Sequence, residues 1–416
     1  MPFRPTSARG DTGGVPDPER VPGASRPALR YLALLWLAGL GLRLTVLAVP
    51  PLLPQIRGSL GLSETALSVL TTLPVLLMAA MAPAGSAVTV LLGPKGTLRI
   101  GLVVIAVAAA LRGTGGAAAL FGLTFVMSTA IAAVQPAMPA LVKQWEPRWV
   151  GLATAVYVNG LLAGEVISAS LTLPAVLPLT GGGWPAALAA WSLPVAATAA
   201  LLGVPRRRTS PAAQAGTTGT ARWWPDWRNG RTWRLGLLQG TGSAAYFGAN
   251  AFLPTYLHSI GHPGLVGAAL TALNAAQIPA SLLLAVLPPR RTTGRAAIAV
   301  LAVTTIAGVP LVLSGNPAAI VAGCILLGFT SASMLITALT LPALLERPED
   351  APRLSAGMFV IGYGMAFLLP LAGGAAWDSS GVPALAFVPS LASAAALLGL
   401  SPALRREHVT SAARRG

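Results

Sequence analysis

The sequence predicts an all-α integral membrane protein of twelve transmembrane helices, arranged as two six-helix pseudo-repeats. Of its 416 residues, 54% are hydrophobic and only 10% are charged, whereas soluble domains carry about 25% charged residues. Residues 235–289 and 296–345 contain no Asp, Glu, Lys or Arg, and each stretch is long enough for two spans. Apolar runs such as residues 101–111 lack the alternation of a membrane β-strand, so helices are expected.

The elements follow from the amino terminus onward. Residues 1–30 are rich in Pro, Gly and Arg and lack the apolar core of a secretory signal, so we interpret them as a disordered cytoplasmic tail. Beyond them, apolar windows between Gly, Pro and charged residues predict the helices. The expected ranges are 31–53, 65–91, 98–112, 116–142, 150–174, 184–203, 234–257, 264–287, 295–314, 316–345, 353–376 and 383–402.

A polar segment divides these helices into two groups of six. Residues 53–73 align without gaps with residues 253–273 at seven identical positions, which supports an internal repeat. Two parallel six-helix repeats are typical of transporters with a substrate site between the repeats at mid-membrane. The predicted domains are an N-terminal bundle at 31–203, a cytoplasmic linker at 204–233, a C-terminal bundle at 234–402 and a cytoplasmic tail at 403–416.

The basic residues indicate topology. The formal net charge is +16, and 25 of the 28 Lys and Arg residues fall in the two tails, the linker and alternate loops. Arg57 and Arg112 are assigned to the opposite face. By the positive-inside rule this pattern predicts that both termini are cytoplasmic. We therefore expect a multi-pass protein of the cytoplasmic membrane, with the lipid bilayer rather than nucleic acid as its partner.

No cofactor or metal site is predicted. The single cysteine, Cys324, excludes an intramolecular disulfide, and His258 and His262 lack a third ligand and are followed by Pro263. We interpret the two histidines as loop residues. The sequence has no phosphate-binding Gly-Lys-Ser/Thr loop for ATP-driven pumping. It also lacks the His and acidic cluster of a membrane enzyme, so no enzyme is expected.

Arg43 is the most informative single residue. It lies about twelve residues into the first predicted helix, roughly 18 Å from the cytoplasmic end and near the bilayer midplane. An arginine there costs about 2.5–3.5 kcal/mol, so an interior partner or a water-filled cavity is expected. Because guanidinium binds carboxylate-like anions through two parallel hydrogen bonds, Arg43 is a candidate substrate-binding residue. The alternative is a structural arginine bonded to carbonyls of a broken helix.

Glu165 is the only acidic residue well inside an apolar segment. It lies roughly 22 Å from the cytoplasmic end of the fifth predicted helix, a depth at which it is a candidate partner for Arg43. A substrate that enters between the two charges could change the protonation of Glu165 and so couple transport to protons. The alternative is a structural salt bridge.

Tyr246 and Asn250 lie four residues apart on the seventh predicted helix, the repeat equivalent of the first. We expect them to face Arg43 across a central cavity as substrate-binding residues. Uncharged polar residues in membrane helices more often form hydrogen bonds between helices. That interpretation is favoured for the remaining members of this class, Asn159, Asn274, Gln277 and Tyr363.

Several short segments carry a family likeness. They are Gly41-Leu42-Arg43-Leu44 with Pro51-Leu52-Leu53-Pro54, Leu70-Thr71-Thr72-Leu73-Pro74-Val75, Pro139-Ala140-Leu141-Val142-Lys143 with Gly151-Leu152-Ala153-Thr154, Gly183-Trp184, and Ala190-Trp191-Ser192-Leu193-Pro194. On these segments the chain resembles the major facilitator superfamily, and within it the cyanate permease and nitroimidazole transporter-like family. The likeness runs from the first to the twelfth helix. Of the family's Asn-Leu-Arg-Pro pattern, Gly41 and Leu44 replace the flanking Asn and Pro.

The resemblance implies a secondary active transporter, a symporter or antiporter working by alternating access. Family members move small anions or small nitrogen-containing organic compounds, so a cyanate-like or nitroimidazole-like small molecule is the expected partner, with protons as a second candidate. Gln135 occupies a place where the family tends to have Asn, which makes it a further candidate substrate-binding residue.

Two alternatives stay open. Residues 89–95 keep Gly93 and one Lys where the superfamily usually has several charges, which allows a non-transporting sensor or scaffold on a transporter fold. An exporter of drug-like compounds is the other. Because aromatic residues make up only 6% of the chain, a small substrate is favoured over a drug-like one.

Overall fold

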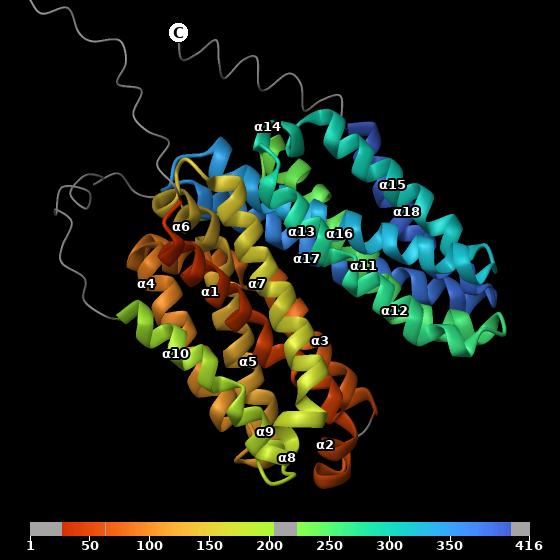
Figure 1. The fold of residues 1–416 in the computed structure, drawn as a ribbon, viewed down its shortest axis with the longest axis horizontal. Coiled ribbons are helices and arrows are strands. Elements are labelled where there is room, and N and C mark those ends of the chain that lie inside the picture. Colours follow the sequence, from red (N-terminus) through yellow and green to blue (C-terminus); the bar gives the residue numbers. More distant parts are fainter. Residues whose placement is uncertain (1–26, 63, 204–222, 401–416) are drawn as a thin grey trace, which may run out of the picture.

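The computed structural model describes residues 27–62, 64–203 and 223–400, and in these ranges the chain forms helices joined by short turns, with no strand. Residues 1–26 of the predicted first tail, most of the predicted linker and the whole predicted tail 403–416 lie outside the described residues. The helices form two groups, an N-terminal half that ends with α10 and a C-terminal half that begins with α11 (Figure 1).

The N-terminal half consists of short and long helices in sequence. Their bounds are α1 Leu29–Leu47, η1 Pro50–Leu52, α2 Leu53–Leu60, α3 Glu64–Ala80, α4 Ala82–Leu111, α5 Gly116–Val134, η2 Gln135–Ala137, α6 Met138–Trp145, α7 Val150–Leu171, η3 Thr172–Val176, α8 Leu177–Leu179, α9 Trp184–Ala190 and α10 Ser192–Gly203.

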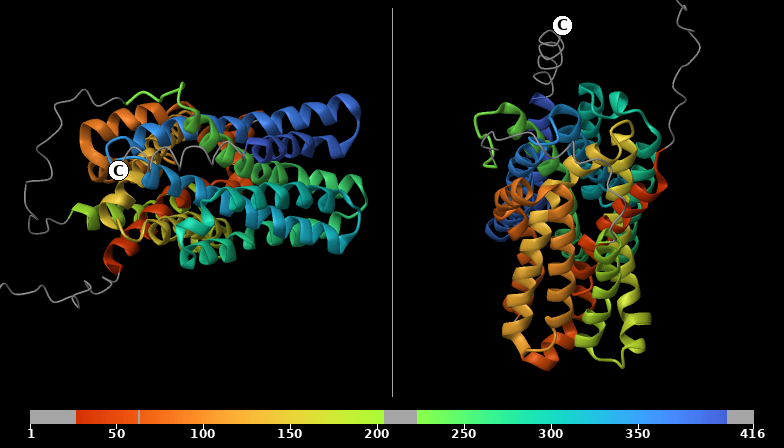
Figure 2. Two further views of the ribbon diagram at one scale, coloured as in Figure 1. Left: turned by 90° about the horizontal axis from the view of Figure 1, so that it is seen from above. Right: turned by 90° about the vertical axis from the view of Figure 1, so that its left-hand side faces the viewer.

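The C-terminal half has fewer interruptions. Its elements are α11 Gly230–Ser259, η5 Pro263–Leu265, α12 Val266–Ala275, α13 Gln277–Val286, α14 Pro289–Thr292, α15 Arg295–Leu313, α16 Pro317–Leu345, α17 Ala351–Ser380, η6 Pro383–Phe387 and α18 Val388–Leu400. Figure 2 shows from two further directions that each half forms one bundle of roughly parallel and antiparallel helices.

α4 contains a chain reversal at Gly93, whose φ of 70° and ψ of 160° are not helical. A Cβ built at Gly85 would lie 2.6 Å from Ala133 Cα, and one at Gly101 would lie 2.2 Å from Val134 Cγ2. These two positions would be about 24 Å apart in a straight helix, yet both contact the end of α5. The chain therefore turns back at Gly93, which agrees with the separate second and third helices predicted from the sequence.

Ten segments of the described chain are long and apolar enough to cross a membrane. The two other predicted spans are α3, whose apolar part Val69–Ala80 is short, and α11. α11 packs between α16 and α17, so it need not be apolar on all sides. Together with these two helices the segments make up the predicted twelve-helix fold.

Proline explains the breaks that divide several predicted helices. α1 stops at Leu47 just before Pro50 and Pro51, α5 ends just before Pro136, and α7 changes to a π-helical turn that contains Pro174. Proline lacks the backbone N–H and clashes with the preceding turn, so a continuous α-helix cannot pass through these points undisturbed.

The apolar core shows how the two halves meet. One large cluster joins residues of both halves, including Leu141 of α6, Leu341 of α16 and Leu354 of α17. Two smaller clusters belong to one half each: one surrounds Leu52 and Trp184, the other Leu257 and Phe387. The halves therefore pack together at the end with α6 and α14, the converging end, and separate toward α2 and α12, the diverging end (Figure 1).

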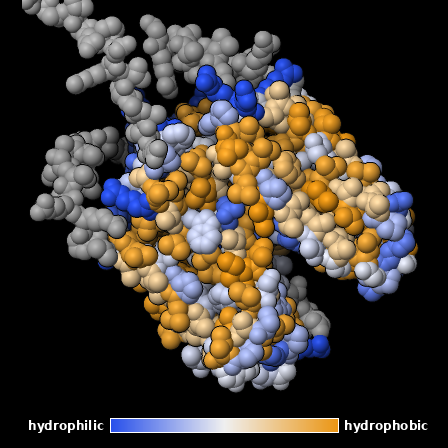
Figure 3. All heavy atoms as spheres, viewed as in Figure 1, coloured by the Kyte–Doolittle hydropathy of each residue, from blue (hydrophilic) through white to orange (hydrophobic). Residues whose placement is uncertain are grey.

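The space-filling view shows the same separation of the N-terminal and C-terminal halves. Hydrophobic residues cover much of the visible face of both halves, and a notch separates the halves at the diverging end (Figure 3). At the converging end, Lys143 Nζ of α6 donates a hydrogen bond to the backbone oxygen of Glu346, just after α16. The Glu346 carboxylate also pairs with Arg231 Nη1 of α11 at 3.2 Å. Polar contacts thus close the converging end as well as apolar ones.

Candidate functional site

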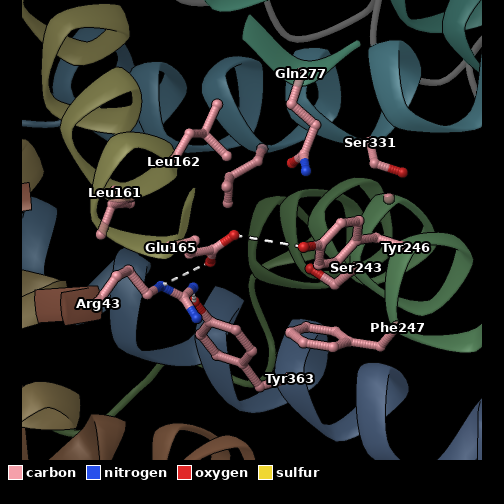
Figure 4. A pocket seen from close by; sticks show the side chains of 12 residues that line it. Arg43, Leu161, Leu162, Glu165, Ser243, Tyr246, Phe247, Gln277, Ser331 and Tyr363 are labelled. Carbon is pink, nitrogen blue, oxygen red and sulfur yellow. Dashed lines mark hydrogen bonds and ion pairs between the residues drawn. The ribbon is translucent and has the colours of Figure 1, made fainter. Parts of the chain in front are cut away.

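A cavity lies between the halves where they begin to separate. Its empty volume is about 450 Å³, including space open to solvent. The residues that line it come from α1, α7, α11, α13, α16 and α17, and they are Arg43, Leu161, Leu162, Glu165, Gly242, Ser243, Tyr246, Phe247, Gln277, Ser331, Leu335 and Tyr363. Both halves therefore contribute to one cavity, which is lined by charged, polar and apolar side chains (Figure 4).

Glycines bring α7 close enough to α1 to pair their charges. A Cβ at Gly160 would lie 2.2 Å from the Trp36 oxygen, and a Cβ at Gly164 would lie 2.6 Å from the Leu40 oxygen. Small residues at such positions let membrane helices approach at backbone distance. Because Glu165 follows Gly164, its side chain leaves α7 directly beside Arg43.

Arg43 and Glu165 form an ion pair, with 3.4 Å between Arg43 Nε and Glu165 Oε1. The two side chains are 8% and 16% exposed, so water screens the pair only weakly. Arg43 Nη2 donates to the Tyr363 hydroxyl at 3.5 Å, a long hydrogen bond, and Arg43 Nε has no acceptor in hydrogen-bond geometry among the described residues. The guanidinium thus retains donor capacity for another acceptor.

The second oxygen of Glu165 faces the C-terminal half. Tyr246 Oη lies 3.4 Å from Glu165 Oε2 (Figure 4). The same oxygen lies 2.8 Å from Asn274 Oδ1. A hydroxyl has one hydrogen, so it donates to only one of these oxygens at a time. When Tyr246 donates to Asn274, its own oxygen is available to accept a hydrogen bond from a protonated Glu165.

Tyr363 connects Arg43 to a deeper amide. Its hydroxyl donates to Gln135 Oε1 at 2.9 Å, and Gln135 Nε2 contacts Met78 Sδ at 3.6 Å. The Tyr363 ring stacks on Phe359 with centroids 5.5 Å apart. The chain of contacts from Arg43 through Tyr363 to Gln135 therefore crosses from one half to the other and back.

The structure places the predicted site residues at two distances from the cavity. Arg43, Glu165 and Tyr246 line it. Gln135 is buried behind Tyr363 and does not line it. Asn250 also lies outside the lining, where its Nδ2 donates to the Tyr246 backbone oxygen and its Oδ1 accepts from Asn274. Gln135 and Asn250 thus contact the tyrosines of the site and do not face the cavity.

Sequence reasoning favoured hydrogen bonds between helices for Tyr363 and Gln277. Tyr363 makes such bonds with Arg43 and Gln135, and both residues also line the cavity. The same reasoning did not single out Ser243, Phe247 or Ser331, which line the cavity as well. The available signal was depth: Tyr363 and Gln277 are polar residues near the middle of their predicted spans. Serine and phenylalanine carry no such signal in a membrane helix.

Arg112 follows the third predicted helix, and its assignment to the face opposite the cytoplasm stays a prediction. Its side chain is 0% exposed and lies inside the N-terminal half. Of the two histidines predicted to be loop residues, His262 lies in the turn after α11, where its Nε2 contacts the Gly315 oxygen at 3.1 Å, but His258 lies in the last turn of α11 and not in a loop. Among the described residues, no group of three or more His, Cys, Asp or Glu is placed to hold a metal.

The family model described as Major Facilitator Superfamily matches residues 35–370. A protein of Bacillus subtilis named uncharacterized transporter YycB is 28% identical over 82% of this chain and 84% of its own. The 2-nitroimidazole transporter of Escherichia coli is 28% identical over 82% of this chain and 86% of its own. The cyanate transport protein CynX of Escherichia coli is 29% identical over 58% and 62%.

Solved structures agree on the fold. The transporter FucP in its outward conformation superposes with a TM-score of 0.67 at 15% identity, covering 90% of this chain and 98% of that one. The human organic anion transporter MFSD10 superposes with a TM-score of 0.70 at 15% identity, covering 91% and 100%. At these identities the likeness concerns the fold alone.

Proposed function

The chain belongs to the Major Facilitator Superfamily, and from this premise we propose that it is a secondary active transporter of a small anionic or nitrogen-containing organic solute. The family match and the transporter-named relatives confirm the resemblance predicted from the sequence, and they indicate a multi-pass membrane transporter rather than an enzyme. Beyond family membership, we propose the class of substrate, its coupling to protons and the orientation of the protein in the membrane.

One observation carries the proposal: charged and phenolic groups from both halves converge on the cavity where the halves separate. Arg43 and Glu165 come from the N-terminal half, and Tyr246 and Tyr363 come from the C-terminal half. A solute bound among them contacts both halves at once. Its binding energy therefore depends on how the halves are oriented, which is what alternating access requires.

Arg43 is the proposed substrate-binding residue. Its hydrogen bond to Tyr363 is long, and its Nε faces Glu165 Oε1 at 3.4 Å without hydrogen-bond geometry, so an anion can bind the guanidinium in competition with the Glu165 carboxylate. Relatives named for 2-nitroimidazole and cyanate support a compact substrate with nitrogen or anionic character.

Glu165 is the proposed coupling residue. An anion bound at Arg43 competes with the Glu165 carboxylate for the same positive charge. Once released from Arg43, Glu165 can take up a proton and donate it in a hydrogen bond to Tyr246. Substrate and proton then move in the same step, which corresponds to symport.

The proposed orientation follows from the basic residues. With both termini in the cytoplasm, the converging end faces the cytoplasm and the diverging end faces outward. The described conformation is then open to the outside, and the contact of Lys143 with Glu346 closes it on the cytoplasmic side. The cytoplasmic membrane is the location that goes with this proposed orientation.

The experiment is counterflow in liposomes that contain the purified full-length protein. The panel of labelled solutes comprises cyanate, nitrite and 2-nitroimidazole, each measured with and without an imposed pH gradient. We expect counterflow of at least one solute and its loss in Arg43→Ala. Arg99→Ala is the matched control, because Arg99 is an exposed arginine on α4 outside the cavity.

The outcomes separate the candidate functions. Counterflow that both arginine variants retain equally would remove Arg43 from the site. No counterflow of any solute, from protein that unfolds cooperatively, would contradict the proposed substrate class. The next probes would then be larger drug-like solutes, and a ligand-binding screen would test the sensor alternative.

A further inference from the structure

Arg112 is a second buried arginine that the proposed transport cycle does not use. It follows directly after α4, and its side chain is among the largest that are fully buried. No ion pair joins it to a carboxylate among the described residues. A buried charge without a counter-charge destabilises the fold, so we ask which contacts stabilise Arg112.

Its main contact is with the end of α1. Arg112 Nη2 donates to the Thr45 backbone oxygen at 2.6 Å, and Nη1 contacts Met127 Sδ of α5 at 3.7 Å. The Thr45 oxygen would normally accept from the Val49 N–H four residues on, but that N–H bonds to the Val46 oxygen instead. The break in α1 thus leaves a free carbonyl, and Arg112 satisfies it.

This hydrogen bond fixes where the charge lies. Thr45 is two residues beyond Arg43, so the hydrogen bond to its backbone oxygen holds Arg112 near the end of α1. Arg43 lines the cavity and Arg112 does not, so Arg112 lies behind the cavity wall, on the order of 10 Å from the Arg43 guanidinium given the helix rise and the length of the two side chains. Its Nε has no acceptor among the described residues, which leaves its charge poorly neutralised.

Two of the buried charges lie at the cavity. Arg43 and Glu165 neutralise one another as a pair. In the rest of the described chain, the charged residues that are buried are Arg112 and Glu146. Glu146 accepts a hydrogen bond from the Ala28 N–H at the start of α1, far from the break. The net charge behind the cavity is therefore that of Arg112, which is positive.

We propose that Arg112 is a specificity-determining residue whose permanent charge, held behind Arg43 by the Thr45 carbonyl, makes the cavity favour an anion over a neutral or cationic solute of equal size. The proposal deepens the proposed function, because it treats the cavity as the substrate site. The test below does not depend on transport.

The potential in the cavity can be measured by thiol chemistry. The chain has one cysteine, so Cys324→Ala gives a cysteine-free background, and Ser243→Cys places one thiol on the cavity lining. The full-length protein reacts separately with an anionic sulfonatoethyl and a cationic trimethylammonium-ethyl methanethiosulfonate. Each rate is divided by the rate for a free thiol in solution, and the ratio of anionic to cationic rate reports the local potential.

We expect Arg112→Gln to lower this ratio about tenfold, because one charge at about 10 Å acts with opposite sign on the two reagents. Arg112→Lys should keep the ratio, since it retains the charge. Arg99→Gln should keep it too, because Arg99 is exposed and outside the cavity lining. Thermal unfolding of each variant shows whether the fold is retained.

A further experiment measures the salt dependence of the ratio in the protein that retains Arg112. A buried charge is screened little by salt, whereas charges at the mouth of the cavity are screened strongly, so the ratio of the Ser243→Cys protein should persist from about 0.05 to about 0.5 M salt. Loss of the ratio at high salt would overturn the proposal. So would an unchanged ratio in folded Arg112→Gln, or equal losses in Arg112→Gln and Arg112→Lys, which would assign Arg112 to holding α1 alone.

The two proposals fail separately. If no solute shows counterflow but the reagent ratio depends on Arg112, the cavity selects anions and the transported solute lies outside the panel. If counterflow depends on Arg43 but the ratio does not depend on Arg112, the transporter stands and Arg112 has no part in its selectivity.

Discussion

Among single residues, the Arg43–Glu165 pair has the largest consequence for function. Both charges belong to the N-terminal half, whereas the hydroxyls that complete their environment, Tyr246 and Tyr363, belong to the C-terminal half. Any movement between the halves therefore changes the hydrogen bonds of the pair while leaving the pair itself in place. The protonation and ligand affinity of the pair are in this way sensitive to conformation.

The role of Glu165 predicts a change in pH dependence. In Glu165→Gln the amide keeps the shape and hydrogen-bonding capacity of the carboxyl group but cannot titrate. We expect counterflow to persist, and uptake with and without an imposed inward proton gradient to become equal. The measurement is uptake of whichever panel solute the parent protein carries.

Asp378→Asn provides the control, because Asp378 is an exposed acid at the end of α17 and outside the cavity. It should respond to the gradient as the parent does. A Glu165→Gln protein that still accumulates its solute with the parent pH dependence would contradict proton coupling through this residue.

The Tyr363 hydroxyl predicts a loss of affinity. Tyr363→Phe removes the hydrogen bonds to Arg43 and Gln135 but keeps the ring stacked on Phe359. We expect KM to rise about tenfold, equivalent to about 1.4 kcal/mol. Tyr256→Phe is the matched control, because its hydroxyl donates to the Leu313 oxygen away from the cavity. Equal KM changes in the two variants would exclude a binding role for Tyr363.

Part of the site was accessible from the sequence for a physical reason. Charged residues are expensive in lipid, so Arg43 and Glu165 stand out by depth alone, and they were expected to be partners before any geometry was known. Uncharged polar residues are common as contacts between helices, so depth could not separate Tyr363, which lines the cavity, from Asn250, which does not. That distinction depends on helix rotation.

Among the helices, the close approach of α1 and α7 determines the geometry of the charge pair. In Gly160→Ala the new methyl group would lie 2.2 Å from the Trp36 oxygen, so the helices must separate. We expect a loss of about 1–3 kcal/mol in stability and weaker substrate binding. The measurements are the thermal unfolding midpoint and KM.

Gly122→Ala is the control for that change. A Cβ at Gly122, within α5, meets nothing within 4 Å, so only helix propensity changes and the midpoint should stay or rise slightly. If both alanine variants behave alike, the contact between α1 and α7 does not limit stability.

The helices themselves were largely predictable, and their interruptions were less so. The apolar windows located all the predicted spans. α11 is not among the ten segments that are long and apolar enough to cross a membrane, but its span was still predicted because residues 235–289 contain no Asp, Glu, Lys or Arg. The break between Leu47 and Leu53 was not predicted, although Pro50 and Pro51 stand there. Proline is frequent in membrane helices and often only bends them, so its presence alone does not locate a break.

At the scale of the whole molecule, the apolar cluster shared by both halves closes the converging end, and the two clusters that belong to one half each leave the diverging end open. Lys143 contributes to closure by its hydrogen bond to the Glu346 oxygen. Lys143→Met should therefore destabilise this state by about 1–2 kcal/mol, which changes the ratio of the two conformations about five- to thirtyfold.

Spin labels at the diverging end would detect that change. Leu179→Cys and Ser314→Cys lie in different halves, and in a Cys324→Ala background they report the separation of the halves by double electron–electron resonance. Lys143→Met should increase the population at short distance. Lys95→Met, an exposed lysine of α4, should not. Identical distance distributions in the two variants would show that Lys143 does not hold the converging end closed.

The pairing of Arg43 with Glu165 also has a consequence for biosynthesis. The two residues are more than a hundred positions apart, so Arg43 leaves the ribosome about ten seconds before its partner is synthesised. Throughout that interval the first helix carries an unpaired charge that opposes its release into lipid. We therefore expect the first helix to become stable in lipid only after the fifth helix is synthesised, and a ribosome that stalls between them to leave a nascent chain whose first helix is incompletely inserted.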